Sequence, residues 1–357
     1  MKFPDTASIA QADLFDEVID VRSPAEYAED HVPGALNRPV LDDAERAEVG
    51  TLYKQVSPFA SKRRGAALVA CNIARHLEES FAQKDRAWRP LVYCWRGGKR
   101  SGAMVHVLRE VGWQAAQLEG GYKAFRREVV ASLATLPAAF RYLVLCGETG
   151  SAKSRLLEAL AAAGAQALDL EGLARHRGSV LGRLPGEPQP AQKMFETRVW
   201  HALRRFDPAR PVFVEAESKK IGEVQVPEGL IQRMRASDCV RIAAPVAERV
   251  RFLLAEYGHF LGNPIALKAQ LDCLAGLHGN DTVHAWQALA DRGAWAELVG
   301  ELLASHYDPA YRRSTDKNFP RLAEARVLDL PSLAPDAIRR AAETLIAEAA
   351  REAAAIV

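Results

Sequence analysis

The chain has 357 residues, of which 48% are hydrophobic and 26% are charged. This length allows two domains with a core each, and the composition is typical of a soluble globular protein. The formal net charge of only +2 excludes a protein that coats nucleic acid over its whole surface, so any RNA contact is expected on a local basic patch.

The cysteines and the first residues indicate a reducing compartment. Five isolated cysteines without a Cys-x-x-Cys pair favour neither a disulfide framework nor a zinc site. The first 15 residues contain acidic side chains and no apolar core, so they do not predict a signal peptide. No uncharged apolar run reaches the ~18 residues of a membrane span. We therefore expect a cytoplasmic protein that has no membrane partner.

The first third of the chain alternates short apolar strands with helices. Strands are predicted at residues 18–21 and 91–93, and apolar residues at helical spacing predict a helix that begins near Ser101. An alternation of this kind is typical of an α/β fold with a mainly parallel sheet.

A domain boundary is expected between Val130 and Phe140. Pro137 interrupts a helical stretch there, and a new strand is predicted at residues 142–145, with another at residues 211–214. This pattern predicts a second α/β domain that begins on the far side of the interruption.

The chain is therefore divided into two expected domains. The N-terminal domain, with a parallel sheet, would comprise residues 1–135, and the second α/β domain would comprise residues 136–357. From Pro245 onward the pattern is mostly helical, and the tail is rich in Ala, Glu and Arg, which favour helix. The second domain is thus expected to end in a helical part.

Cys94 begins a short loop, residues 94–101, which we call the cysteine loop. Gly97 and Gly98 allow the backbone to turn tightly, so that its N–H groups can form an anion-binding nest in front of a helix. Neighbouring cations favour thiolate over thiol, because they stabilise the charged form. These cations are Arg96, Lys99 and Arg100. Cys94 is therefore the candidate nucleophile, whereas the other four cysteines are expected to be structural.

Two chemistries are compatible with this loop. Cysteine phosphatases use Cys, five residues and then Arg, which Cys94 and Arg100 satisfy, and rhodanese-type sulfurtransferases use a similar loop. Tyr93 stands where most such phosphatases have histidine, and the flanking segments from residue ~15 to ~130 resemble rhodanese signatures. These segments are Asp20-Val21-Arg22, Glu26-Tyr27, His31-Val32-Pro33-Gly34-Ala35 and Gly120-Gly121-Tyr122.

The resemblance to rhodanese implies roles for three residues. It implies that Cys94 carries a transferable sulfur as a persulfide, or selenium in the analogous form. Asp20 and Arg22 lie at the end of a predicted strand, where they are expected to brace the cysteine loop rather than to react.

Residues 147–154, Gly-Glu-Thr-Gly-Ser-Ala-Lys-Ser, follow a predicted strand and precede a helix, and we call them the phosphate loop. This is the context of a Walker A motif, in which backbone N–H groups surround a diphosphate. Lys153 would neutralise the phosphates, and Ser154 could bind Mg²⁺. The residues expected to bind phosphate are Gly147, Thr149, Gly150, Ser151, Lys153 and Ser154.

The phosphate loop departs from the usual motif at Ala152, where glycine is expected. A methyl group there should crowd a nucleoside triphosphate or shift it outward, so the loop indicates phosphate binding more strongly than nucleotide hydrolysis. Glu215, at the end of a predicted strand, is the Walker B candidate, and Glu217 is the next. No metal site is predicted with certainty.

A rhodanese domain followed directly by a P-loop NTPase-like domain resembles the tRNA 2-selenouridine synthase family. The resemblance spans nearly the whole chain, and its most specific part is the run Arg-His-Arg-Gly-Ser at residues 175–179. The matching segments are residues 45–51, 53–55, 94–98, 169–179, 215–218 and 221–222, Tyr307-Asp308-Pro309 and Tyr311.

The family resemblance implies a two-step reaction on the 2-thiouridine at the wobble position of certain tRNAs. Geranyl diphosphate first alkylates the sulfur, and selenophosphate then supplies selenium while the geranylthio group leaves. Cys94 would carry the selenium, and Gly65 matches a family glycine associated with geranylation. The resemblance implies these two co-substrates, no tightly bound cofactor and a possible selenophosphate-supplying enzyme as partner.

The polyanionic tRNA requires cations on the protein. Arg175 and Arg177 flank a turn downstream of the phosphate loop, from which they could reach a phosphate ligand or the tRNA backbone, and Trp95 could stack on a base or be buried. The other candidates are Lys62-Arg63-Arg64, Arg126-Arg127, Lys219-Lys220 and Arg312-Arg313.

The sequence is thus compatible with three functions. The first is the tRNA-modifying transferase. The second is a rhodanese-type sulfurtransferase or Cys-x5-Arg phosphatase with a regulatory P-loop domain. The third is an RNA-binding module that senses redox state, which the cations around Cys94 disfavour.

Overall fold

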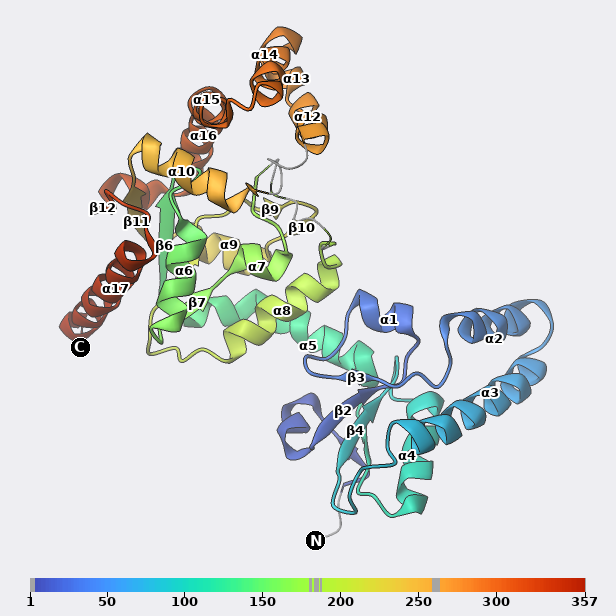
Figure 1. The fold of residues 1–357 in the computed structure, drawn as a ribbon. Helices are drawn as coiled ribbons and strands as arrows, with labels where there is room; N and C mark the ends of the chain where they lie inside the picture. The colour runs from blue at the N-terminus through green and yellow to red at the C-terminus, as the bar shows by residue number, and fades with distance from the viewer. Residues whose placement is uncertain (1–3, 180–181, 183–185, 187, 259–263, 357) are drawn as a thin grey trace. The chain divides into compact units, whose positions relative to one another are not determined.

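A computed structural model describes residues 4–179, 182, 186, 188–258 and 264–356 (Figure 1). The chain forms two compact units, each with a five-stranded sheet whose strands are all parallel. The N-terminal unit consists of Met1–Ser132 and Pro190–His201, and the C-terminal unit consists of Leu133–Gln189 and Ala202–Val357. The expected α/β fold, with a parallel sheet in each domain and a helical C-terminal part, is confirmed.

The sheet of the N-terminal unit has the strand order β1-β5-β4-β2-β3. Its buried strands supply a core that Ile19, Val92 and Met104 share with neighbouring helices. The strands are β1 (Thr6–Ala7), β2 (Glu17–Asp20), β3 (Leu36–Asn37), β4 (Pro90–Tyr93) and β5 (Ala116–Leu118). The helices are η1 (Ile9–Leu14), α1 (Pro24–Glu29), α2 (Asp43–Gln55), α3 (Pro58–Glu79), α4 (Lys99–Val111) and α5 (Gly121–Thr135).

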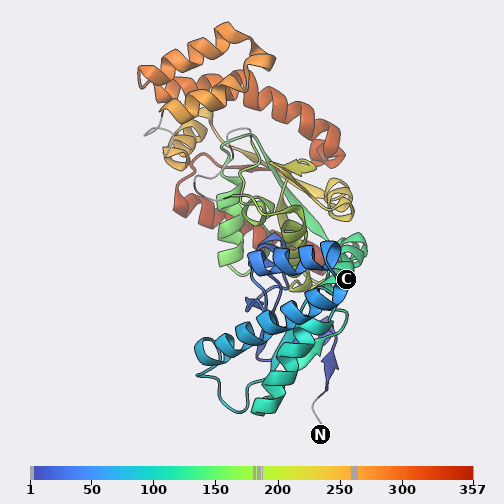
Figure 2. The ribbon, with the colours of Figure 1, turned by 90° about the vertical axis from the view of Figure 1, so that its right-hand side faces the viewer.

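Helices α2 and α3 form a hairpin, seen side by side in Figures 1 and 2. Asp42 caps the start of α2 by accepting a hydrogen bond from the Glu45 N–H, and Ser57 caps α3 in the same way. Gly65 lies where the two helices approach each other, because a Cβ built there would lie 3.3 Å from a methyl group of Val49. The structure therefore gives Gly65 a packing role in this hairpin.

A short segment from the second half of the chain belongs to the N-terminal unit. Pro190–His201, with the first part of α8 (Gln192–Arg204), lies outside the range 1–135 expected for this domain. It joins the unit because Trp200 packs edge-on against Phe125 with ring centroids 5.5 Å apart, and because Glu196 forms an ion pair with Arg126. Pairing between residues so distant in sequence leaves no local pattern, so the segment was not anticipated.

The sheet of the C-terminal unit has the strand order β12-β11-β6-β8-β7. Its central strand β6 is buried throughout, and it leads directly into the phosphate loop. The strands are β6 (Tyr142–Gly147), β7 (Gln166–Leu168), β8 (Val212–Glu215), β11 (Asp238–Ala243) and β12 (Arg326–Asp329), and a separate antiparallel pair is formed by β9 (Lys220–Ile221) and β10 (Val224–Gln225).

Most helices of the C-terminal unit lie after residue 245, as the sequence predicted. Helices α12 to α16 gather at one end of this unit's sheet in both views (Figures 1 and 2), and α17 packs along α6 with its buried face in the core. The helices are η2 (Leu136–Ala139), α6 (Lys153–Ala162), α7 (Leu170–Ala174), α9 (Glu228–Arg235), α10 (Val246–Glu256), α12 (Pro264–Asp272), α13 (Ala275–His278), α14 (Asn280–Asp291), α15 (Trp295–Leu302), the π-helical turn η3 (Leu303–Tyr307), α16 (Asp308–Asn318), η4 (Pro320–Glu324) and α17 (Pro335–Ile356).

The predicted strands agree with the structure. Residues 18–21, 91–93, 142–145 and 211–214 overlap β2, β4, β6 and β8, and α4 begins two residues before Ser101. Among the residues that the structure describes, no helix is long and apolar enough to cross a membrane.

Asp20 and Arg22 form a buried brace at the end of β2. The Arg22 guanidinium donates to both carboxylate oxygens of Asp20 and to the Asp30 carbonyl oxygen, and it lies 3.9 Å from the ring centre of Tyr122. Both charged side chains are at most 1% exposed. Tyr122 follows the glycine pair that contacts the cysteine loop, so the expected bracing role of these two residues has a structural basis.

Replacing Arg22 by Met should leave the Asp20 carboxylate buried without its counter-charge. We expect a loss of roughly 3–5 kcal/mol in the free energy of unfolding, measured by urea denaturation of the full chain. Arg89→Met is the matched control, because the Arg89–Asp16 pair is 42% and 40% exposed and should contribute less than about 1 kcal/mol. Equal stabilities of the two variants would contradict the brace.

Candidate functional site

The cysteine loop connects β4 to α4 and is held against the turn at Gly120-Gly121. Gly97 has a φ of 63°, and a Cβ there would lie 2.7 Å from the Leu118 carbonyl oxygen. Gly121 has a φ of 57°, and a Cβ there would lie 2.3 Å from the Cys94 carbonyl oxygen. Both positions therefore require glycine, because two backbone segments pack against each other without room for side chains.

The sulfur of Cys94 is buried and accepts hydrogen bonds from its own loop. The Gly98 N–H donates to Sγ over 3.3 Å and the Ser101 hydroxyl over 3.2 Å. Burial raises the pKa of the Cys94 thiol, but the hydrogen bonds from Ser101 and Gly98 outweigh burial, so the pKa lies below its ordinary value. This environment favours the nucleophilic thiolate.

The cations of the cysteine loop differ in what they contact. Arg96 and Lys99 are exposed beside the loop, whereas Arg100 forms an ion pair with Glu26 over 2.9 Å. In a Cys-x5-Arg phosphatase the arginine must bind the substrate phosphate, so its pairing with Glu26 disfavours the phosphatase alternative. Trp95 packs on Tyr122 with ring centroids 5.2 Å apart, which favours the buried alternative for this side chain over base stacking.

The phosphate loop connects β6 to α6 in the C-terminal unit. Ala152 precedes the helix in a left-handed conformation, with φ 60° and ψ 31°, which glycine adopts at lower cost. Its methyl group is 3% exposed and packs in the hydrophobic core cluster with Leu156 and Leu160. The methyl group that was expected to crowd a triphosphate is therefore largely covered by the core.

A buried arginine that the sequence did not reveal fixes the phosphate loop. Arg249 on α10 is 1% exposed, and it donates to the Thr149 carbonyl oxygen over 2.8 Å. It also forms ion pairs with Glu148 and Asp308, and the Gly147 N–H donates to the Tyr311 hydroxyl over 2.6 Å. An arginine in an amphipathic helix is usually exposed, so only the distant acidic partners could have identified it.

Lys153 and Ser154 already hold internal partners in this structure. The Lys153 ammonium donates to the Gly147 carbonyl oxygen over 2.7 Å, and the Ser154 hydroxyl donates to a Glu171 carboxylate oxygen over 2.7 Å. Within the described residues, no group of three His, Cys, Asp or Glu side chains is arranged to hold a metal ion. The Mg²⁺ contact expected of Ser154 stays a prediction.

The two Walker B candidates lie in different surroundings. Glu215 is fully buried, accepts a hydrogen bond from the Glu171 N–H over 2.8 Å and does not line the cleft at the phosphate loop. Glu217 does line this cleft, together with Glu171. Burial and the charge of Glu171 raise the pKa of Glu217 to about 8, so Glu217 is neutral near pH 7.

The Arg-His-Arg-Gly-Ser segment closes over these carboxylates. Gly178 has a φ of 65°, and a Cβ there would lie 2.8 Å from a Glu171 carboxylate oxygen and 3.0 Å from both of Glu217. Arg177 lines the same cleft and pairs with Glu256 over 3.1 Å, whereas Arg175 is exposed at the end of α7. The segment thus forms one wall of the cleft at the phosphate loop.

Two predicted binding residues lie elsewhere. Lys219 pairs with Glu228 over 2.8 Å and does not line the cleft, and Gly65 lies in the α2–α3 hairpin of the N-terminal unit. Three further candidate tRNA-binding cations are also in ion pairs, namely Arg64 with Glu48, Arg126 with Glu196, and Arg312 with Glu148.

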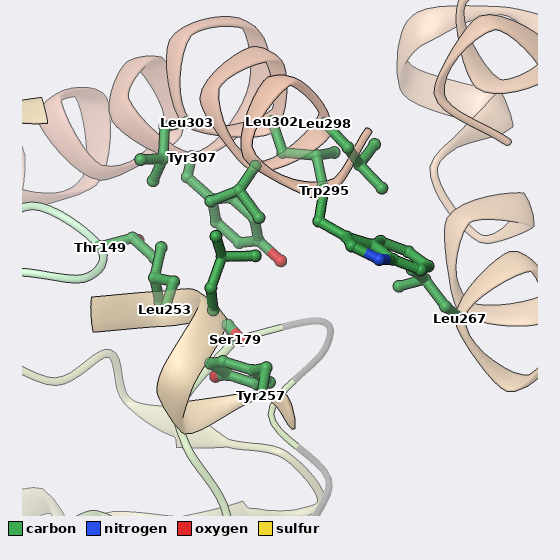
Figure 3. A pocket seen from close by; sticks show the side chains of 12 residues that line it. Thr149, Ser179, Leu253, Tyr257, Leu267, Trp295, Leu298, Leu302, Leu303 and Tyr307 are labelled. Carbon is green, nitrogen blue, oxygen red and sulfur yellow. The ribbon is translucent and has the colours of Figure 1, made fainter. Parts of the chain in front are cut away.

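An apolar pocket adjoins the phosphate loop (Figure 3). Thr149, Leu253 and Tyr307 line both this pocket and the polar cleft, so the two cavities are neighbours. The π-helical turn η3 supplies Leu303 and Tyr307 to its wall. The complete lining is Thr149, Ser179, Leu253, Leu254, Tyr257, Leu267, Trp295, Leu298, Val299, Leu302, Leu303 and Tyr307. The sequence did not reveal this pocket, because leucines at helical spacing are also typical of a core.

The comparisons with known proteins identify the family. A model of the tRNA 2-selenouridine synthase AAA domain matches residues 140–275, and a rhodanese-like domain model matches residues 6–128. A tRNA 2-selenouridine synthase of Alcanivorax borkumensis is 36% identical over 330 residues, which cover 82% of this chain and 88% of the relative. This chain belongs to the tRNA 2-selenouridine synthase family.

Other members of the family align over different lengths. The synthase of Cupriavidus necator is 35% identical over 353 residues, covering 89% of this chain and 94% of the relative. The synthase of Nitrosomonas europaea is 35% identical over 244 residues, which cover 67% of this chain and 63% of the relative. In a solved structure, the N-terminal domain of a Clostridium difficile protein described as ATP/GTP binding is 38% identical, with 35% of this chain and 98% of that chain covered and a TM-score of 0.31.

Membership in the tRNA 2-selenouridine synthase family confirms the predicted family and the predicted order of domains. As a member, the chain is an enzyme. The roles of individual residues stay predictions that rest on the geometry above.

Ser101→Ala should raise the pKa of Cys94, because it removes the hydroxyl that donates to Sγ. The pH midpoint of Cys94 alkylation by iodoacetamide should therefore shift upward, as measured by site-resolved mass spectrometry of the full chain. The exposed Cys71 in the same sample serves as the reference. An unchanged Cys94 midpoint would show that the hydroxyl does not stabilise the thiolate.

Glu217→Gln should change how the binding of inorganic pyrophosphate depends on pH. As pH rises through about 8, Glu217 becomes an anion beside Lys153, so the wild-type affinity should fall while the variant retains its neutral amide. The ratio of variant to wild-type affinity should rise about tenfold between about pH 7 and about pH 9. Because both proteins are titrated with the same ligand at each pH, the ligand's own ionisation cancels.

The control for this measurement is Glu158→Gln, an exposed carboxylate that lines the same cleft. The ratio of its pyrophosphate affinity to that of the wild type should be the same at both pH values. A ratio for Glu217→Gln that is constant with pH would refute the raised pKa of Glu217.

Proposed function

We propose that this enzyme converts 2-thiouridine at the tRNA wobble position to 2-selenouridine through an S-geranyl intermediate. In the first step the uridine sulfur attacks geranyl diphosphate and diphosphate leaves. In the second step the selenium of selenophosphate attacks the same ring carbon and the geranylthiolate leaves, and water then cleaves the selenium–phosphorus bond to release phosphate. The observation that carries this proposal is the apolar pocket that adjoins the phosphate loop and shares Thr149 with the polar cleft.

The phosphate loop supports the binding of the diphosphate. The N-terminus of α6 and the Lys153 ammonium present positive charge to the polar cleft, as an anionic ligand requires. A hydrocarbon chain attached to that diphosphate would find Leu253 and Tyr307 directly beside the loop. A nucleotide would instead place a sugar and a polar base there, which an apolar pocket does not favour.

The cysteine loop supports the selenium step. Selenophosphate is a small anion, and the loop combines a thiol of lowered pKa with exposed Arg96 and Lys99. Cys94 is the only one of the five cysteines that has such surroundings in the sequence, so it is the cysteine that we assign to the selenium step. Selenophosphate implies a supplying enzyme as a partner.

The tRNA partner requires cations that are not neutralised within the chain. Arg63 and Arg127 are exposed, and we assign them, with Lys62 and Lys220, to contacts with the tRNA phosphates. The cations that already form ion pairs would have to exchange their carboxylate partner for a tRNA phosphate before they could contribute to tRNA binding.

Mutations in the two loops should block different steps of the reaction when the variants are expressed in cells that lack the native protein. With a Cys94→Ser copy, tRNA should accumulate S-geranyl-2-thiouridine without 2-selenouridine. With a Lys153→Ala copy, S-geranylation should fall by roughly a hundredfold or more, leaving 2-thiouridine, because a cation at the diphosphate is lost. Mass spectrometry of digested tRNA measures all three nucleosides.

Cys71→Ser is the matched control, since Cys71 is an exposed thiol on α3 of the same unit. Its tRNA should match that of the wild type. Persistence of 2-selenouridine with Cys94→Ser, or of S-geranyl-2-thiouridine with Lys153→Ala, would overturn the assignment of that loop.

A further inference from the structure

The apolar pocket has a defined beginning and end. In Figure 3, Thr149 of the phosphate loop lies on one side, and Trp295 with Leu267 lies on the other. Leu253 of α10 and Tyr307 of the π-helical turn lie between them.

The far wall comes from two different helices. Trp295 is the first residue of α15, and Leu267 lies on α12 with 5% exposure. Both belong to the hydrophobic cluster that holds these helices together. Leu298 and Leu302 of the same cluster also line the pocket and are at most 4% exposed, so the far wall consists of apolar side chains that pack on one another.

The chemistry of the lining changes along the pocket. The polar side chains that line it are Thr149, Ser179, Tyr257 and Tyr307, of which Figure 3 shows Thr149 on the side of the phosphate loop. At Trp295 and Leu267 the wall is apolar, and no charged side chain lines the pocket. A ligand that fits is anionic at one end and hydrocarbon at the other.

We propose that Trp295 and Leu267 determine the length of the prenyl chain that this enzyme accepts. This inference rests on the proposed function, in which geranyl diphosphate is the alkyl donor. The diphosphate is fixed at the phosphate loop, so each added isoprene unit extends the chain toward the far wall. A wall of packed side chains excludes an extra unit sterically, whereas a shorter chain leaves apolar surface unfilled. The ten-carbon geranyl chain is then preferred over both its five-carbon and fifteen-carbon homologues.

Binding of prenyl diphosphates to the full chain tests this inference. Affinities for inorganic pyrophosphate and for dimethylallyl, geranyl and farnesyl diphosphate are measured by isothermal titration calorimetry on the wild type, Trp295→Ala and Leu267→Ala. The ratio of farnesyl to geranyl affinity should rise at least about tenfold in each variant, because removing a side chain from a closed wall admits the longer chain. Pyrophosphate affinity should stay unchanged.

Ile265→Ala is the matched control. Ile265 lies on α12 near Leu267 but is 82% exposed and does not line the pocket, so its variant should keep the wild-type ratio. Trp295→Phe, which shortens the wall without emptying it, gives a second variant should Trp295→Ala fail to fold.

The outcomes separate this inference from the proposed function. If the wild type binds geranyl diphosphate no more tightly than pyrophosphate, the alkyl donor itself is wrong. A second outcome is that the wild type prefers geranyl diphosphate while the ratio of farnesyl to geranyl affinity is the same in Leu267→Ala, the Trp295 variants and Ile265→Ala. In that case geranyl diphosphate remains the alkyl donor, and the role of this wall in selecting chain length is overturned.

Discussion

The buried guanidinium of Arg249 organises the C-terminal unit. A buried cation must be neutralised and fully hydrogen-bonded, and Arg249 meets this need through the Thr149 carbonyl oxygen and the Asp308 carboxylate. Arg249 of α10 thereby fixes the positions of the phosphate loop and α16 relative to α10. Leu253 lies one helical turn after Arg249, and Tyr307 directly precedes Asp308, so the same contacts set two walls of the apolar pocket. The phosphate loop and the apolar pocket beside it are therefore positioned by the same contacts.

The two loops share one construction and differ in their charges. Each follows a buried parallel strand, turns at a glycine of positive φ (Gly97 or Gly150) and leads into a helix, so backbone N–H groups are available for an anion. In the cysteine loop the hydrogen bonds converge on the Cys94 sulfur. In the phosphate loop, Lys153 supplies a compact cation instead. The nucleophile and the diphosphate site that we propose are thus built on two different loops of one chain.

Local patterns predicted most of the fold, whereas contacts between distant residues were missed. Strands β2, β4, β6 and β8 and both loops were predicted, because apolar runs and glycine-rich turns are signals within a few residues. The pairing of Arg100 with Glu26 and the burial of Arg249 depend on partners far away in sequence. The segment 190–201 joined the N-terminal unit for the same reason. Helix periodicity cannot distinguish a leucine that fills a core from one that lines a pocket, such as Leu302.

We propose that the phosphate loop and the apolar pocket together bind geranyl diphosphate. The heat-capacity change of binding, from calorimetry at several temperatures for geranyl diphosphate, pyrophosphate and ATP, tests this most directly. A distinctly more negative heat-capacity change is expected for geranyl diphosphate than for pyrophosphate, because apolar surface is buried only with the former. Equal values for these two ligands, together with tight ATP binding that geranyl diphosphate does not displace, would contradict it.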